Sequence, residues 1–337
     1  MRGGPSRRAL SFGLVLAGLG LLLVFALLGS LLLGSVKVAP IDVLKALFGA
    51  GPEDVVAIVR TLRLPRALLG VLVGGSLALS GASLQALLGN PLADPYLLGV
   101  SGGAACGTLV GSLIGLGAGT FLGSIALPLA AFAGALVAVL LVGLGASVGG
   151  RLDRGRLLLS GVVVNALASS VLLFLLSFGG AARTQSFVFW MLGSLSGATG
   201  GAVRALALYA ALGLAILVPL SRAFDALTLG EETAQTLGVS VESVKRTAYV
   251  AASLLAAAAV AYAGIIGFVG LLVPHAVRRL CPGHRALLVL SFLGGGVLLV
   301  AADTLSRWLF APAEISVGAM TALVGAPAFL VLMRRRG

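Results

Sequence analysis

Residues 62–104 read LRLPRALLGVLVGGSLALSGASLQALLGNPLADPYLLGVSGGA, and this stretch decides the class of fold. It carries no charged side chain from residue 67 to residue 93, and glycine, alanine and serine recur along it. A transmembrane helix needs about 20 apolar residues, each rising about 1.5 Å. The stretch therefore predicts a span over residues 66–88 and the start of another over residues 97–117. Recurrent small residues let such helices pack backbone to backbone.

The rest of the chain has the same character. Of its 337 residues 59% are hydrophobic and 10% are charged, and the mean hydropathy is +1.13. Soluble domains carry about 25% charged residues, so most side chains here never face water and the protein is an integral membrane protein. A membrane β-barrel would show short alternating segments with aromatic girdles, which the sequence lacks. The net charge of +12 indicates topology rather than nucleic-acid binding, because the basic residues lie between apolar runs.

The apolar runs predict an all-α, polytopic membrane protein whose residues 1–337 form a single transmembrane domain. About ten spans are expected, and the least separated pair meets at the turn AGIIG. The first run is too long for a signal peptide, so we expect it to stay as a span. The expected spans are 10–35, 66–88, 97–117, 124–147, 157–178, 201–221, 247–264, 266–280, 287–309 and 317–333.

The placement of lysine and arginine orients these spans. Cytoplasmic loops carry the excess of basic residues, and both termini are then predicted to be cytoplasmic. Residues 37–62 are expected to form a short surface helix on the outer side, and residues 183–200 an outer interfacial or re-entrant helix. The cytoplasmic set is Arg2, Arg7, Arg8, Arg151, Arg154, Arg156, Arg222, Lys245, Arg246, Arg278, Arg279, Arg285, Arg334, Arg335 and Arg336.

One cytoplasmic stretch, TLGEETAQTLGVSVESVKR at residues 228–246, is polar and helix-prone. Thr228 and Glu231 have the spacing of a capping box, and Gly238 suits a helix end, so a helix over about 228–239 is predicted. This helix is interpreted as a docking element for another protein, and the alternative is a solvated connector between two spans.

No residue pattern indicates catalysis. His275 and His284 lack a third ligand at metal spacing and are interpreted as packing or interfacial histidines. No phosphate-binding loop is present, so the chain is not expected to bind ATP or any cofactor itself. Asp303 is expected to pair with Arg307 one helical turn later, and the alternative is a proton or ion role. Cys106 and Cys281 are not expected to form a disulfide.

Several motifs resemble the permeases of iron-chelate and cobalamin ABC importers. Besides residues 62–104 these are FVFWMLGSLSGA (187–198), LTLGEETAQTLGV (227–239), AGIIGFVGLLVPHAVRRL (263–280) and AADTLSRWLFAPAEISVGAMTALVGAPAF (301–329). The match runs in order from about Leu62 to the C-terminus, whereas the first sixty residues match only as one span and an outer segment.

The resemblance implies a homodimer of ten-helix subunits in the bacterial inner membrane, in contact with lipid and not with nucleic acid. Two ATPase subunits that hold ATP and Mg²⁺ are expected below, and a substrate-binding protein above. The polar helix then resembles the coupling helix that seats in the ATPase. Its matching residues are Leu229, Glu231, Glu232, Ala234 and Gly238.

Other positions are carried over singly from the family. Asn90 and Leu92 match the first loop of a cytoplasmic gate. In the second gate loop, Arg154 and Gly155 stand where the family usually has small polar residues. The alternative role for Arg154 is that of a positive-inside anchor. The pathway candidates are Asn165, Ser169 and Ser170, which alternatively hold neighbouring helices together. The candidates for docking the binding protein are Arg63, Arg66 and Arg307, which alternatively are interfacial anchors.

Two other classes compete with an importer permease. A secondary carrier or channel would need deep ionisable residues, and a membrane enzyme would need clustered Asp, His or Cys. The sequence supplies neither pattern. It does not distinguish ferric siderophore, haem and cobalamin as ligands, because the binding protein performs most of the selection in this family.

Overall fold

The computed structural model describes residues 7–34, 36–116, 121–281, 283–309, 311 and 313–334. Arg2, Arg335 and Arg336 of the predicted cytoplasmic set lie outside them. The order of elements is α1 Arg7–Leu32, α2 Pro40–Leu47, α3 Glu53–Ala57, η1 Ile58–Arg63, α4 Leu64–Leu88, η2 Pro95–Leu98, α5 Val100–Leu113, α6 Phe121–Ala146, β1 Ser147–Val148, β2 Arg151–Leu152, α7 Arg154–Leu176, α8 Ala181–Met191, α9 Gly200–Leu217, α10 Ser221–Leu227, α11 Glu231–Thr236, α12 Val241–Ala263, α13 Val269–Val277, α14 His284–Trp308 and α15 Val317–Arg334.

The described residues contain seven helices long and apolar enough to cross a membrane. They coincide with seven of the expected spans, and the multi-span helical class is confirmed. Val100–Leu113 and Val317–Val331 are shorter apolar helices at two further expected spans. The expected span 266–280 contains only the nine-residue α13, because residues 264–268 are not helical.

The outer segment 37–62 differs from the expectation of one short surface helix. Helix α2 matches it, but α3 and η1 continue directly into α4 as one helical run, Glu53–Leu88. Pro52 precedes this run, and the π-helical turn η1 ends just before Pro65. A proline ring conflicts with regular α-helical geometry in the preceding turn, which a widened turn relieves. The helix expected over residues 183–200 is present only in part, as α8, Ala181–Met191, and residues 192–199 are not helical.

Small residues allow the helix backbones of the core to approach closely. A Cβ placed on Gly74 of α4 would lie 2.1 Å from the Gly295 carbonyl oxygen of α14. One placed on Gly81 would lie 1.9 Å from the Gly270 oxygen of α13. Helices α5 and α6 meet in the same way, since a Cβ on Gly107 would lie 2.1 Å from the Ala130 oxygen. These distances leave no space for a side chain, so the packing is the backbone-to-backbone type expected of membrane helices.

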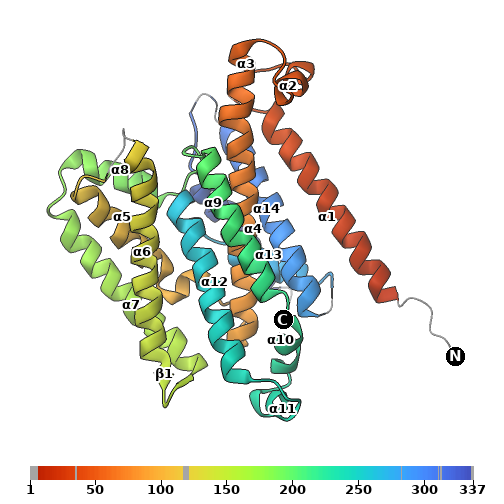
Figure 1. The fold of residues 1–337 in the computed structure, drawn as a ribbon, viewed down its shortest axis with the longest axis vertical. Coiled ribbons are helices and arrows are strands. Elements are labelled where there is room, and N and C mark those ends of the chain that lie inside the picture. The colour runs from red at the N-terminus through yellow and green to blue at the C-terminus, as the bar shows by residue number, and fades with distance from the viewer. Residues whose placement is uncertain are drawn as a thin grey trace.

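Helix α4 runs through the centre of the bundle (Figure 1), and its side chains from Val73 to Leu88 are buried. Helices α5, α6 and α7 lie on one side of it, and α1 and α14 on the other. Helices α2 and α3 lie at one end of the molecule, whereas the hairpin of β1 and β2 and the helix α11 lie at the opposite end. The hairpin and α11, which are both predicted to be cytoplasmic, therefore share one end of the fold.

Candidate functional site

The polar stretch 228–246 forms a separate short helix, but not with the predicted bounds. Helix α10 ends at Thr228, whose hydroxyl donates to the Asp225 carbonyl oxygen at 2.6 Å. The backbone turns at Gly230, with φ 105°, and α11 covers only Glu231–Thr236. The predicted capping box of Thr228 and Glu231 is therefore wrong, because Thr228 closes the preceding helix instead of opening α11.

The predicted end of this helix at Gly238 is confirmed. Gly238 has φ 84°, its N–H donates to the Gln235 oxygen at 2.9 Å, and the Val239 N–H donates to the Ala234 oxygen at 3.0 Å. This is the Schellman arrangement, in which a left-handed glycine closes the last turn. Ala234 is fully buried, so it holds α11 against the rest of the protein.

The opposite face of α11 is open to its surroundings. The side chains of Leu229 and Leu237 are 65% and 63% exposed, and Glu232 is exposed between them. Helix α11 lies at one extreme end of the molecule (Figure 1). These exposed side chains stand beside the buried Ala234, so one side of α11 packs on the protein and the other is open.

Glu231, in contrast, is held within the chain. One carboxylate oxygen lies 2.9 Å from Nε of Arg154, and the other lies 3.1 Å from Nζ of Lys245, whose side chain is buried. The predicted coupling residue Glu231 and the predicted gate residue Arg154 therefore belong to one ion cluster. Gly155 follows Arg154 in the first turn of α7 and is exposed.

The loop between α4 and η2 is shaped by two side-chain caps. Gly89, with φ 62°, ends α4, and the Asn90 side-chain oxygen accepts from the Leu92 N–H at 2.9 Å. Asp94 accepts from the Tyr96 N–H at 2.8 Å and so caps η2. Leu92 remains exposed. Burial raises the pKa of Asp94 to about 6, and the hydrogen bond from Tyr96 opposes part of that rise.

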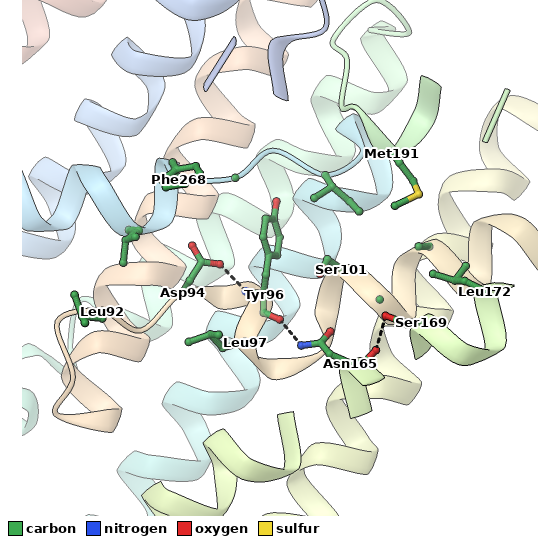
Figure 2. Close-up of a pocket in the computed structure, with 15 residues that line it drawn as sticks. Leu92, Asp94, Tyr96, Leu97, Ser101, Asn165, Ser169, Leu172, Met191 and Phe268 are labelled. Carbon is green, nitrogen blue, oxygen red and sulfur yellow. Dashed lines mark hydrogen bonds between the residues drawn. The ribbon is translucent and has the colours of Figure 1, made fainter. Parts of the chain in front are cut away.

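A cavity of about 630 Å³ opens beside this loop and is shown in Figure 2. Loop 89–99, helix α7 and the non-helical segment 264–268 all contribute to it. Asn165 Nδ2 donates to the Tyr96 carbonyl oxygen at 3.0 Å, and Ser169 Oγ donates to the Asn165 oxygen at 2.9 Å. The polar members of the lining are Asp94, Tyr96, Ser101, Asn165 and Ser169.

The structure separates the three pathway candidates. Asn165 and Ser169 line the cavity, whereas Ser170 does not and donates to the Ala166 oxygen at 3.0 Å. Asp94 and Tyr96 line it too, and they were not recognised in the sequence. The Tyr96 hydroxyl donates to the Ile266 oxygen at 2.9 Å and accepts from the Ile266 N–H at 3.0 Å. This long-range tether has no signal in residue spacing.

Two of the three outer arginines, Arg66 and Arg307, share one carboxylate. Asp303 is 1% exposed, lies 3.0 Å from Nε of Arg307 and lies 2.9 Å from Nη2 of Arg66. The predicted pairing of Asp303 with Arg307 is confirmed. Arg66 reaches onward to Glu314 at 3.0 Å. We refer to Arg66, Asp303, Arg307 and Glu314 as the outer ion cluster.

Arg63 lies beside this cluster and is held by backbone oxygens. Its guanidinium donates to the Leu31 oxygen at 2.6 Å and to the Val36 oxygen. Arg307 donates to the Ser30 hydroxyl at 2.9 Å. Both arginines are 5% exposed, so their guanidinium groups fasten the end of α1 to α4 and α14 rather than reaching the surface as interfacial anchors. Docking through them stays a prediction, and Arg66 with Glu314 is the more accessible pair.

Both histidines lie inside the protein. His284 Nδ1 lies 2.7 Å from Asp225 Oδ1, and the His284 N–H donates to the same oxygen at 3.0 Å. His275 packs edge-on against Phe329 at 6.0 Å between ring centroids. Across the described ranges no three His, Cys, Asp or Glu side chains gather as a metal site would require, and Cys106 and Cys281 are free thiols.

A bundle of apolar helices, a cavity lined by a few polar groups and a short exposed helix at one end are features of a polytopic membrane protein of the transport class. More particularly, the chain belongs to the FecCD transport family, because the family model matches residues 22–335. The match begins well before Leu62, where the recognisable motifs start.

Similar proteins are import permeases. The chain is 46% identical over 286 residues to the cobalamin import system permease protein BtuC of Halobacterium salinarum, covering 85% of this chain and 75% of that protein. It is 39% identical over 318 residues to the Fe(3+)-citrate import system permease protein YfmD of Bacillus subtilis, covering 94% and 92%. It is 38% identical over 339 residues to the hemin transport system permease protein HmuU of Yersinia pestis, covering 96% of each.

A solved structure shares the fold. A metal-chelate type ABC transporter in an inward-facing conformation aligns with a TM-score of 0.83 and 30% identity, covering 96% of this chain and 99% of that chain. The resemblance carried by the sequence motifs is therefore confirmed, and this chain is a membrane permease.

Proposed function

We propose that this chain is the permease subunit of an ATP-driven importer that takes up a large metal chelate, namely a ferric siderophore, haem or cobalamin. Membership of the FecCD transport family over residues 22–335 supports the permease assignment. The ligand class rests on relatives named for cobalamin, Fe(3+)-citrate and hemin import.

The proposed assembly is a homodimer in a bacterial inner membrane, with two ATPase subunits on the cytoplasmic side and a substrate-binding protein outside. Ten crossings per subunit are proposed, counting α5, α13 and α15 beside the seven long helices. Both termini are placed in the cytoplasm. ATP and Mg²⁺ bind the ATPase subunits, and the permease performs no chemistry.

The observation that carries the proposal is the open face of α11. Leu229, Glu232 and Leu237 are exposed, while Ala234 on the other side of the helix is fully buried. A short helix whose backbone hydrogen bonds are satisfied internally moves as a rigid unit. An ATPase that binds the open face would therefore move α11 together with α7 and α12, which contact it through Glu231.

The cavity is the proposed section of the pathway in this subunit. A large chelate needs a broad surface that binds it weakly, and the lining is mostly apolar with a few polar groups. Asn165 and Ser169 present polar atoms there, and Ser170 is not assigned to the path. Asn90 and Leu92, together with Arg154 and Gly155, are proposed as the cytoplasmic gate.

The binding protein is proposed to dock at the end that carries α2 and α3. Arg66 and Glu314 form the accessible edge of the outer ion cluster, with side chains 14% and 41% exposed. A cavity of about 190 Å³ lies beside them and is also lined by Arg63 and Arg307. The two buried arginines would then support the docking surface by holding α1, α4 and α14 together.

Uptake by the assembled transporter in liposomes tests the proposal. The permease, its ATPase subunits and the binding protein are reconstituted, and uptake of haem, cobalamin and a ferric siderophore is measured separately. ATP-dependent uptake of one chelate is expected. Uptake of the same chelate by the permease without the ATPase would instead support a stand-alone secondary transporter or channel.

A further inference from the structure

Arg154 occupies a junction between three elements at the end of the molecule that carries α11. It is the first residue of α7, directly after Asp153, whose carboxylate accepts from the Arg156 N–H at 2.8 Å. Its Nε lies 2.9 Å from Glu231 Oε1, which belongs to the first turn of α11. One side chain therefore connects the beginnings of α7 and α11.

The same guanidinium also reaches the end of α4. A Cβ placed on Gly89 would lie 3.2 Å from Nη1 of Arg154, so the guanidinium lies over the glycine that ends α4. Asn90 and Leu92, the first gate residues, follow at once. In addition, Nε and Nη2 of Arg154 are buried, and in the described part of the chain neither makes a hydrogen bond, so the contact of Nε with Glu231 is an ion pair only. A buried donor without a partner is unusual, and it is available to carbonyl oxygens of loop 89–99 if that loop moves.

The partner carboxylate is itself held in place. Lys245 of α12 donates to both oxygens of Glu231, at 3.2 and 3.1 Å, and its side chain is only 6% exposed. Glu242 of α12 accepts from the Leu152 N–H at 2.9 Å and so fixes the hairpin that leads into α7. Glu231 and the start of α7 are thus both anchored to α12, and Arg154 bridges them.

From this geometry we infer that Arg154 is a positioning residue that transmits displacement of α11 to loop 89–99 and to α7, which carries Asn165 and Ser169. This inference rests on the proposed function, in which the ATPase moves α11. It replaces the interpretation of Arg154 as a positive-inside anchor. An anchor needs only a positive charge at the interface, whereas a transmitting residue needs its contacts with Glu231 and Gly89.

Arg156 provides the matched control. It has the same charge, lies in the same first turn of α7 and is exposed. In the reconstituted transporter, Arg154→Gln is expected to lower ATP-driven uptake about fivefold, the upper range for a partly exposed ion pair, while basal ATP hydrolysis is retained. Arg156→Gln is expected to leave both unchanged. Arg154→Lys is expected to restore part of the uptake, since its ammonium can reach Glu231 without the planar guanidinium contact at Gly89.

A double-mutant cycle tests whether the pair acts as a unit. Glu231→Gln alone is expected to lower uptake, and adding Arg154→Gln to it is expected to cause no further loss. A cysteine at Leu92, in a protein whose Cys106 and Cys281 are replaced, reports the gate. Its modification by a bulky thiol reagent is expected to depend on nucleotide in the Arg156→Gln background and to lose that dependence in the Arg154→Gln background.

Equal uptake by the Arg154→Gln and Arg156→Gln proteins, or additive losses in the cycle, would overturn the inference. Glu232→Lys serves as the separate test of the proposed function, because Glu232 faces outward from α11. If Glu232→Lys uncouples the transporter but Arg154→Gln does not, only the inference about Arg154 fails. If Glu232→Lys leaves coupling intact, the proposed contact of α11 with the ATPase fails.

Discussion

Replacing Asp303 by Asn tests whether the outer ion cluster is a structural fastening. Asp303 is 1% exposed and is the shared carboxylate of Arg66 and Arg307, which it contacts at 2.9 and 3.0 Å. The amide is nearly isosteric but removes the negative charge, so Arg307 loses its ionic partner and Arg66 retains only Glu314. Arg63 lies close by and adds a third positive charge, since a Cβ placed on Gly34 would lie 3.0 Å from Nη2 of Arg63 and 3.5 Å from Nη1 of Arg307.

The magnitude follows from burial. Removing one partner of a buried ion pair costs about 3–5 kcal/mol, because the remaining charge stays desolvated without compensation. Asp303→Asn is therefore expected to lose about that much stability. Glu314→Gln is the control, since this side chain is 41% exposed and contacts Arg66 alone. An exposed pair is worth about 0.2–1 kcal/mol, so the control is expected to stay close to the unmodified protein.

The assay heats the detergent-purified permease to a series of temperatures. The fraction that still elutes as folded protein on size-exclusion chromatography is measured at each temperature and gives the melting temperature. Asp303→Asn is expected to unfold at a clearly lower temperature than Glu314→Gln. Equal melting temperatures for the two variants would refute the structural interpretation. A fully stable Asp303→Asn protein that loses uptake would favour the proton or ion role for this carboxylate.

Three further changes probe packing, titration and the end of α11. Gly81→Ala is expected to prevent folding, because its Cβ would lie 1.9 Å from the Gly270 oxygen, whereas Gly197→Ala, which meets open space, is expected to be silent when yields of folded protein are compared. Asp94 has a folded pKa of about 6, above its unfolded value near 4, so the folded state binds the proton first. The unmodified protein is therefore expected to gain thermal stability relative to Asp94→Asn as the pH falls from about 6 to about 4, and a pH-independent difference would contradict this. Gly238→Val places a β-branched residue at φ 84° and is expected to cost about 1–3 kcal/mol locally and to lower ATP-driven uptake, while unchanged uptake would argue against a rigid α11.

Local sequence patterns predicted much of this molecule because membrane helices are encoded by composition over one contiguous run. The end of α11 at Gly238 was predictable for the same reason, since a left-handed turn favours glycine. The start of α11 was not, because Thr228 and Gly230 both fit a helix boundary, and only the backbone shows that Thr228 closes α10 while Gly230 precedes α11. The pairing of Asp303 with Arg307 could be predicted from the sequence, because residues at positions i and i+4 are neighbours on a helix.

Contacts between distant segments had no comparable signal. Arg66 and Asp303 are 237 positions apart, and Tyr96 and Ile266 are 170 apart. The shortened helix α13 has a similar origin. Gly264 and Phe268 adopt positive φ values of 70° and 67°, and the Tyr96 hydroxyl holds Ile266 between them, so an apolar run that reads as a span is partly unwound. Likewise, the sequence shows Arg154 only as one of several basic loop residues, and its contact with Glu231 is seen only in the structure.

Whether α11 couples the permease to the ATPase is decided by the ratio of ATP hydrolysed to chelate taken up in the Glu232→Lys transporter. Arg204→Glu on α9 is the exposed control. Both proteins are reconstituted with the ATPase subunits and the binding protein, and ATPase binding, ATP hydrolysis and chelate uptake are measured in the same vesicles. The account predicts that Glu232→Lys remains a folded permease but releases the ATPase or hydrolyses ATP without uptake, while Arg204→Glu transports normally. Normal ATPase binding and a normal ratio of ATP hydrolysed to chelate transported in Glu232→Lys would contradict it.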